Sequence, residues 1–297
     1  MLQSAPIDTP VVSKLAVHRS RHLIAPFRLL TPRSFVEARR MLDDFPQAVP
    51  MAGGLDVVTG MKTGAGPSVI VWLGGIAGAH LPVKDGDNLV LPAGCSHDQL
   101  VRSAVAAAAF PDLVAAWSGL ANIRIRNQGT VVGNVMAGVA GYEAAVLLMA
   151  AYAKLAVLSP GGAEHVIKVS DLERENGAGA VPWLVTAVHI PLQKKGRERR
   201  LIYDRSLRPA LSVALGLDTQ DRTILRARAV LGGCHGRPIL RELPLASVDL
   251  DSLRGQESRI ASKTFQDLPP PSAAWLGTPD YPAAMAPRLL FRLLGAA

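Results

Sequence analysis

The sequence predicts a mixed α+β protein with two or three domains, and three observations support this prediction. The chain has 297 residues, which is more than one ordinary hydrophobic core holds. Its hydrophobic fraction of 49% and charged fraction of 19% are typical of a folded chain with ample core or interface surface. Short strand-like runs alternate with helical patterns, and two of these units, at 48–58 and 122–134, carry glycine turns.

The first part of the chain contains a tail, four predicted strands and two predicted helices. Residues 1–25 mix charges with no hydrophobic block, so we expect a flexible arm rather than a signal peptide. Ser34 is expected to cap a helix over 34–45, whose apolar residues recur at helical spacing. A second helix is expected over 96–108, with His97 as a capping or surface histidine. The strands predicted here are residues 27–32, 48–53, 68–73 and 88–94.

The segment 122–134 carries the most informative pattern. Ile123 and Ile125 alternate with arginines, which predicts a short strand with one buried face. Gly133-Asn134 then suits a tight turn with positive φ, and a helix-compatible run follows at 142–153. A strand, a turn with exposed amides and a helix together form a seat for a phosphate group. An ordinary turn between two core elements is the alternative.

The unit at 48–58 repeats this order, with a Gly-Gly pair between a strand and an apolar helical segment. Its spacing does not follow GxGxxG, so a Rossmann-type dinucleotide site is disfavoured. Further strands are predicted at 154–158 and 184–191, and a basic run at 194–200 then marks a domain boundary. This run is interpreted as a solvated linker, with a docking surface for an acidic partner or a nucleic-acid contact as alternatives.

After the basic run the sequence predicts a second α+β domain. Its strands are expected at 211–217 and 227–233, with a turn at 219–222 between them. A closing helix is predicted over 283–294, with its regular part starting only at Pro287.

Composition excludes several classes of function. The formal charge is +8, but aromatic residues make up only 5% of the chain, too few for the stacking platforms of a nucleic-acid binder. No apolar run is long enough for a membrane span. Cys95 and Cys234 are too few and too far apart for an iron–sulfur or zinc site in this chain, so no metal ligand is predicted. A reduced, cytoplasmic setting is the default expectation.

Four motifs, in order along the chain, resemble those of the medium, FAD-binding subunit of the molybdenum hydroxylases. Met51–Asp56 is similar to the first flavin loop, AGGTDL or AGGHSL, and Ile125–Asn134 to the second, IRNxGTIGGN. Leu231–Pro238 is similar to the ALGGVAPTP segment, and Thr278–Tyr281, followed by 285–294, to the closing GxAEYR helix. The resemblance covers the chain from about residue 26 to its end.

The resemblance implies a fold and a division into domains. It implies a two-lobed FAD-binding domain of the vanillyl-alcohol-oxidase/PCMH type, followed by a smaller C-terminal domain of a three-stranded sheet plus helices. The FAD is expected between the lobes. The boundaries expected from the resemblance and the composition are an arm at 1–25, lobes at 26–85 and 86–193, a basic linker at 194–200 and a C-terminal domain at 201–297.

The resemblance also implies which residues contact FAD. The two glycine loops hold its pyrophosphate through backbone amides in this family, and a Tyr and a Lys of a YxK segment lie near the flavin. No catalytic acid or base is nominated. The positions expected to bind the cofactor are Ala52, Gly53, Gly54, Leu55, Asp56, Arg126, Asn127, Thr130, Val132, Gly133, Asn134, Glu143, Tyr203 and Arg205.

Three positions depart from the family pattern. Leu55 replaces a Thr or His that could reach a phosphate, and Glu143 replaces an Asp. Val132 replaces the first Gly of the GGN turn, where a β-branched residue is a poor fit to positive φ. Loss of a buried contact at Leu55 or Val132 is expected to weaken FAD binding by roughly 1–3 kcal/mol each.

By this resemblance the chain is expected to be an electron-transfer subunit that is inactive alone on substrate. A large partner would carry the molybdopterin centre and a small partner the 2Fe–2S clusters, in a dimer of heterotrimers. The alternative is a degenerate flavin domain that has lost FAD and serves as a structural subunit. A stand-alone flavin oxidase is disfavoured, because no substrate-site constellation is present.

Overall fold

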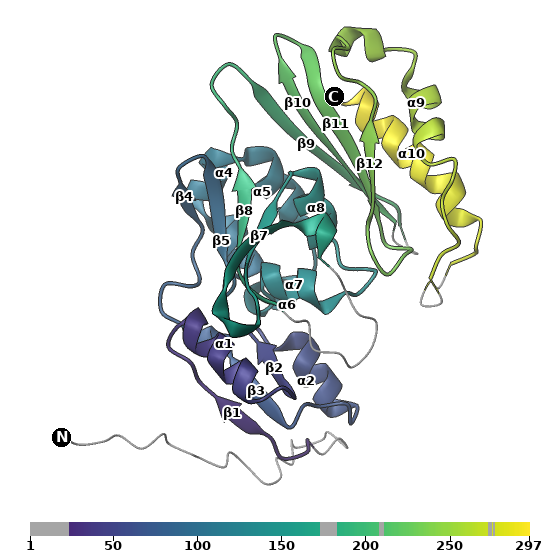
Figure 1. Ribbon diagram of the computed structural model, residues 1–297. Helices are drawn as coiled ribbons and strands as arrows, with labels where there is room; N and C mark the ends of the chain where they lie inside the picture. The colour runs from purple at the N-terminus through teal and green to yellow at the C-terminus, as the bar shows by residue number, and fades with distance from the viewer. Residues whose placement is uncertain (1–23, 173–182, 208–210, 273–274, 276) are drawn as a thin grey trace, which may run out of the picture.

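The computed structural model describes residues 24–172, 183–207, 211–272, 275 and 277–297. The predicted flexible arm lies almost wholly outside these ranges. Figure 1 shows three sheets that follow one another from the N-terminal to the C-terminal end of an elongated molecule. This arrangement confirms the predicted α+β class.

The first sheet is parallel, with the strand order β1-β3-β2. Its strands are β1 (Arg28–Leu30), β2 (Ala48–Met51) and β3 (Val69–Trp72), and the 3-10 turn η1 (Leu73–Gly75) follows β3. The helices α1 (Phe35–Asp44) and α2 (Leu55–Lys62) form the crossovers. The predicted cap of α1 is confirmed, because Ser34 Oγ accepts a hydrogen bond from the Glu37 amide at 3.1 Å.

The second sheet is antiparallel, with the order β4-β5-β8-β6-β7. Its strands are β4 (Val83–Asp85), β5 (Asn88–Pro92), β6 (Lys154–Leu158), β7 (Glu164–Lys168) and β8 (Leu184–Pro191), with η2 (Pro160–Gly162) and η3 (Val169–Asp171) at strand ends. β4 and β5 pair as one hairpin, so the predicted lobe boundary at residue 85 falls inside it. The expected lobe limits themselves stay a prediction.

Six short helices accompany this second sheet. They are α3 (His97–Arg102), α4 (Ala104–Ala109), α5 (Pro111–Ser118), α6 (Ile123–Gln128), α7 (Val131–Ala137) and α8 (Ala144–Ala150). The single helix predicted over 96–108 is two helices, because Ser103 has extended backbone angles and caps α4. Every residue of α8 is buried, which places this apolar helix in the core beside the sheet.

The C-terminal sheet has four strands in the order β12-β11-β10-β9, one more than the three expected. Its strands are β9 (Glu198–Arg205), β10 (Ser212–Gln220), β11 (Thr223–Gly232) and β12 (Ile239–Leu243). After η4 (Leu250–Leu253), α9 (Glu257–Thr264) and α10 (Tyr281–Gly295) cover one face of this sheet. α10 begins at Tyr281 rather than at Pro287, since Pro282 occupies the first turn, where its missing N–H is not needed.

The basic run is only partly a linker, because β9 starts within it at Glu198. The Arg199 guanidinium is buried and pairs with Asp218 of β10, with Nε and Oδ1 2.6 Å apart. Arg226 binds the other carboxylate oxygen of Asp218. Arg226 and Arg228 each lie 3.7 Å from the ring centroid of Tyr152, at the end of α8. The two ion pairs lie within the C-terminal sheet, and the contacts with Tyr152 join this sheet to the second lobe.

The structure corrects the prediction for residues 122–134. Residues 123–128 form α6 rather than a strand, because Asn122 Oδ1 caps the amides of Arg124 and Ile125 at 3.0 and 3.1 Å. Ile123 and Ile125 are exposed, so the alternation has no buried face. The expected turn at Gly133 is the first part of α7, and its φ is not positive.

Val132 is therefore not strained. It lies in a right-handed helix and packs into the core with 7% of its surface exposed. The steric objection to a β-branched residue at this position was wrong, because no left-handed backbone is needed there.

Candidate functional site

A large cavity runs between the first and second sheets and reaches β9 of the C-terminal sheet. Its volume is about 860 Å³, within the range of cofactor sites. Its walls come from α1, the start of α2, the start of α7, the segment before α8, Trp183 and Arg205. Most of these elements lie far apart in the sequence, so the cavity is a product of tertiary packing.

The first glycine loop presents open backbone amides to this cavity. Gly54 has φ 77° and precedes α2, and no side chain caps that helix. Within the described part of the chain, nothing accepts a hydrogen bond from the amides of Gly54, Leu55 or Asp56. The N-terminal end of the helix dipole adds positive potential at the same place, so this helix start favours an anionic group.

The second predicted loop lies directly against the first. A Cβ at Gly53 would lie 2.0 Å from the Gln128 carbonyl oxygen, so only glycine fits the contact. The Gln128 carboxamide also donates to the Gly53 carbonyl at 3.0 Å, across 75 residues of sequence. The two glycine motifs identified in the sequence therefore form one continuous wall of the cavity.

The amides of the second loop are mostly engaged within the protein. The Val131 amide donates to the Cys95 carbonyl at 2.9 Å, and the Gly133 amide to Thr130 Oγ1 at 3.0 Å. Asn134 Oδ1 accepts from the Ala144 amide at 3.2 Å and so fixes the start of α8. The expectation of an open amide at Gly133 was therefore wrong. The start of α2 is the stronger anion-binding position of the two loops.

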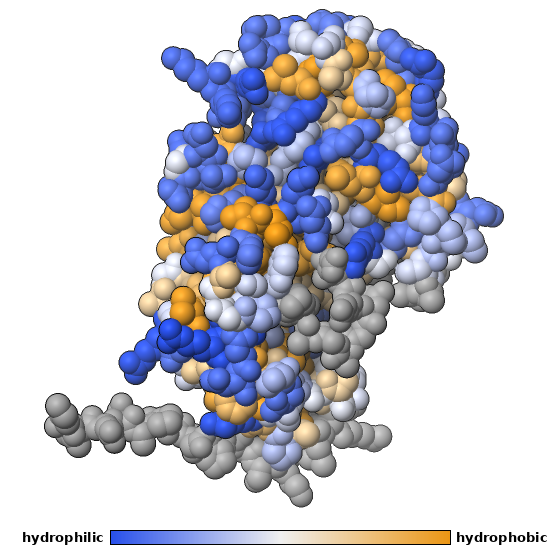
Figure 2. Space-filling model, in the orientation of Figure 1, coloured by the Kyte–Doolittle hydropathy of each residue, from blue (hydrophilic) through white to orange (hydrophobic). Residues whose placement is uncertain are grey.

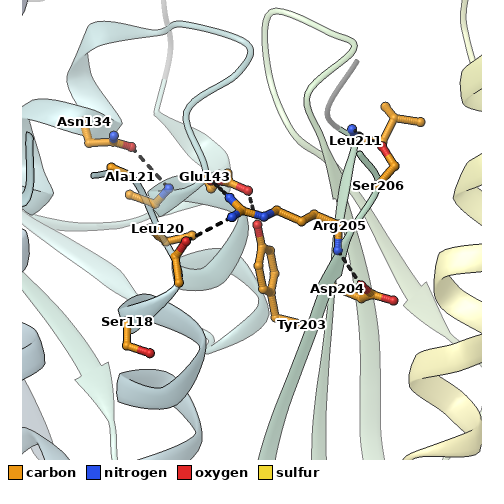
Figure 3. A network of polar contacts seen from close by, with 12 residues as sticks. Ser118, Leu120, Ala121, Asn134, Glu143, Tyr203, Asp204, Arg205, Ser206 and Leu211 are labelled. Carbon is orange, nitrogen blue, oxygen red and sulfur yellow. Dashed lines mark hydrogen bonds and ion pairs between the residues drawn. The ribbon is translucent and has the colours of Figure 1, made fainter. Parts of the chain in front are cut away.

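A polar cluster closes the cavity at the C-terminal sheet (Figure 3). The Tyr203 hydroxyl donates to Glu143, and Arg205 Nη1 lies 3.4 Å from Glu143 Oε2. Arg205 Nη2 also donates to the Gly119 carbonyl at 3.2 Å. Burial, together with the Glu143 carboxylate, raises the pKa of Tyr203 far above its usual value, so the phenol stays a donor. Glu143 and Arg205 border the cavity, and Tyr203 supports the carboxylate from outside its lining.

A second polar contact links the two lobes beside the cavity. The Tyr142 hydroxyl donates to Asp56 Oδ1 at 2.6 Å, and both residues line the cavity. Burial and the adjacent Asp56 carboxylate raise the pKa of Tyr142 to about 12.

The structure brings most of the predicted site residues together. Those that line the cavity are Ala52, Gly53, Gly54, Leu55, Asp56, Thr130, Gly133, Asn134, Glu143 and Arg205.

The other predicted positions have different surroundings. Val132 is in the core, and Asn127 borders a separate surface hollow of about 470 Å³, which Gly53 also lines. The Arg126 guanidinium donates to the carbonyls of Ser118, Leu120 and Ala121, so it stabilises the turn before α6 instead of lining the cavity.

Several residues of the wall were not predicted from the sequence, among them Arg39, His97, Tyr142 and Trp183. A signal for Tyr142 was its position next to Glu143. No sequence pattern indicated Arg39 or Trp183, because these residues reach the cavity only through the packing of α1 and β8.

His97 is a buried histidine rather than a surface one. It is 3% exposed, and its Nδ1 accepts a hydrogen bond from Trp117 Nε1 at 3.0 Å. Burial and the positive charge of Arg126 lower the pKa of His97 from 6.5 to about 4. The imidazole is therefore neutral at pH 7, which matches its role as an acceptor.

This shift predicts acid sensitivity. The unfolded chain binds a proton at His97 below about pH 6.5, whereas the folded chain does so only below about pH 4. The free energy of unfolding should therefore fall by about 3 kcal/mol between pH 7 and pH 4 through this residue. Urea denaturation of the native chain and of His97→Gln at both pH values measures this difference. Equal pH dependence in the two proteins would contradict the prediction.

Two further features of the described residues bear on function. No group of three or more His, Cys, Asp or Glu side chains there is placed to hold a metal ion. None of the helices there is long and apolar enough to cross a membrane. Figure 2 shows hydrophilic residues over much of the visible face, with hydrophobic residues gathered on the C-terminal domain and over the middle of the molecule.

Known proteins share both the sequence pattern and the fold. Residues 25–193 match the family described as "FAD binding domain in molybdopterin dehydrogenase". The chain is 29% identical over 234 residues to the nicotine 6-hydroxylase medium subunit of Paenarthrobacter nicotinovorans, covering 77% of this chain and 81% of that protein.

Two solved structures have a similar fold. A chain of carbon monoxide dehydrogenase from Hydrogenophaga pseudoflava aligns with a TM-score of 0.79 and 20% identity, over 91% of this chain and 96% of that chain. A chain of quinoline 2-oxidoreductase from Pseudomonas putida 86 aligns with a TM-score of 0.75 and 21% identity, over 92% and 97%.

Proposed function

The chain belongs to the family of FAD-binding domains in molybdopterin dehydrogenases, and from this premise we propose that it is the electron-transfer subunit of a heteromeric molybdenum hydroxylase. The observation that carries the proposal is the cavity of about 860 Å³ whose wall includes the open amides at the start of α2. Fold similarity supports the same family but does not by itself identify the reaction.

The residues of the cavity fit FAD. The pyrophosphate of the cofactor is an anion, and the amides of Gly54, Leu55 and Asp56 are donors in need of an acceptor. Leu55 contributes through its backbone, so the lost side-chain hydroxyl or imidazole does not remove this donor. Close contact between the loops at Gly53 keeps the wall narrow where the backbone must approach the phosphates.

The charged end of the cavity fits the polar edge of the flavin ring. That edge carries both hydrogen-bond donors and acceptors, and Glu143 and Arg205 offer an acceptor and a donor beside each other. Tyr203 holds the Glu143 carboxylate in place. Bound FAD would supply the redox chemistry, while the protein binds it, orients it and sets the charge around it.

In the proposed complex, different subunits carry the different redox centres. The relative from Paenarthrobacter nicotinovorans is a medium subunit of a hydroxylase. We infer that this chain likewise works with a large molybdopterin subunit and a small subunit with 2Fe–2S clusters, in a dimer of heterotrimers. It would pass electrons from those clusters to an external acceptor, and it would not turn over substrate alone.

The alternative, a degenerate domain that has lost FAD, rested on Leu55 and Val132. The helical backbone at Val132 and the backbone donor at Leu55 remove these two arguments for it.

Removal of flavin from the purified complex tests the electron-transfer role. The complex without flavin should no longer reduce its external acceptor, while its metal centres still reduce an artificial dye. Readdition of FAD should restore transfer to the external acceptor. Undiminished transfer without flavin would refute the proposal and favour a structural subunit.

A further inference from the structure

Trp183 presents an aromatic surface to the cavity, and a second ring supports it. It immediately precedes β8 and borders the cavity. Its ring stacks on His165 of β7, with centroids 5.9 Å apart and planes inclined by 14°. His165 Nε2 is in turn 3.2 Å from Ser159 Oγ, which restrains the imidazole. The indole is thus held in one orientation while part of it faces the cavity.

Trp183 packs against the core of the second lobe, at the end of the cavity that lies beside α1. Its neighbour Leu184 is buried in the core of the first lobe with Ala48, and Leu42 of α1 packs on the same cluster. Leu42 and Arg39, also from α1, line the cavity as Trp183 does. Glu143, which precedes α8, lies instead opposite Arg205 of the C-terminal sheet (Figure 3). The cavity therefore has an aromatic side, where Trp183 lies near the Arg39–Asp43 ion pair, and a second side formed by the Glu143–Arg205 pair.

We propose that Trp183 stacks on the adenine ring of the bound dinucleotide, an inference that rests on the proposed function. FAD carries two ring systems joined by its pyrophosphate. The flavin ring, with its polar edge, suits Glu143 and Arg205, so the adenine is left with the aromatic side. A purine offers a π-face that stacks well on an indole and needs no particular hydrogen-bond partner.

Equilibrium binding to the full chain, freed of flavin, tests this assignment. The probes are FAD, adenosine diphosphate and FMN. FAD contains the adenine, the pyrophosphate and the flavin ring. Adenosine diphosphate contains only the adenine and the pyrophosphate, and FMN contains the flavin ring with a single phosphate. Trp183→Ala should raise the Kd of FAD and of adenosine diphosphate by about tenfold, because base–aromatic stacking is lost. Its Kd for FMN should stay unchanged.

Fluorescence gives a second measurement that does not need the alanine variant to fold. Adenosine diphosphate should quench tryptophan emission of the native chain, and Trp183→Phe should remove this quenching while it keeps binding by calorimetry. Trp72→Phe is the matched control, since Trp72 lines the separate surface hollow and not the cavity. That control should retain the quenching.

Three results would overturn the assignment, and they differ from one another. If the native chain binds neither FAD nor adenosine diphosphate, the proposed function fails together with the inference. If the native chain binds FAD and Trp183→Ala binds FAD and adenosine diphosphate equally well, the function stands and the stacking role is wrong. If Trp183→Ala loses FMN instead of adenosine diphosphate, the tryptophan faces the flavin ring.

Discussion

Gly53→Ala should weaken FAD binding by about tenfold to a hundredfold. The new methyl group would lie 2.0 Å from the Gln128 carbonyl oxygen, a distance that forces the two loops apart. Overpacking of this kind costs about 1–3 kcal/mol. The strain falls on the wall that should hold the pyrophosphate, so we expect it in cofactor affinity as well as in stability. Flavin titration of the purified variant measures the first effect and thermal denaturation the second.

Gly60→Ala is the matched control for this substitution. Gly60 lies on α2 in the same lobe, and a Cβ there would be 3.4 Å from the Ala65 carbonyl oxygen, an ordinary contact. Alanine also favours a helix over glycine. The control should keep the native affinity for FAD. If Gly53→Ala binds FAD as tightly as Gly60→Ala does, contact between the two loops is not what shapes the site.

Asp218→Ala should destabilise the protein by about 3–5 kcal/mol, because it leaves a buried positive charge without its partner. The Arg199 and Asp218 side chains are 9% and 8% exposed, and Arg226 binds the same carboxylate. Burial alone would raise the pKa of Asp218, but hydrogen bonds and charges of Arg199 and Arg226 outweigh it and lower the pKa. This contribution is therefore present at neutral pH and lost as the pH falls through the lowered pKa.

Asp251→Ala offers the comparison for this prediction. Asp251 pairs with Arg222 at 2.7 Å, but the two side chains are 57% and 61% exposed. An exposed pair of this kind contributes about 0–1 kcal/mol. Urea denaturation at neutral pH should therefore separate the two variants clearly. Equal losses of stability would contradict the prediction, because the buried cluster of the C-terminal sheet would then contribute no more than an exposed ion pair.

Strands with strong local patterns were predictable from the sequence. β6 and β8 have the bounds that the sequence predicted, since their apolar residues are numerous and turn residues flank them. The Ser34 cap of α1 was predictable for the same reason, as its hydrogen bond is local. The strand predicted at 123–126 failed because the alternation of isoleucine and arginine competes with the helix cap of Asn122, and the cap prevails.

The candidate site was predictable in its loops but not in its assembly. Glycine motifs located the wall at Gly53 and Thr130, yet the contact between Gly53 and Gln128 joins residues 75 positions apart. Local sequence patterns do not predict a contact between residues so far apart in the chain. Trp183 reaches the cavity for a similar reason, through the pairing of β8 with β6.

An absorbance spectrum of the purified protein, co-expressed with its partner subunits, tests the central claim most directly. Acid precipitation should then release the flavin for identification. We expect a flavin spectrum and one FAD per chain. The amides at the start of α2 would bind the pyrophosphate, and the pair of Glu143 and Arg205 would bind the flavin ring. A colourless chain that still co-purifies with a molybdenum subunit and does not take up added FAD would contradict the account.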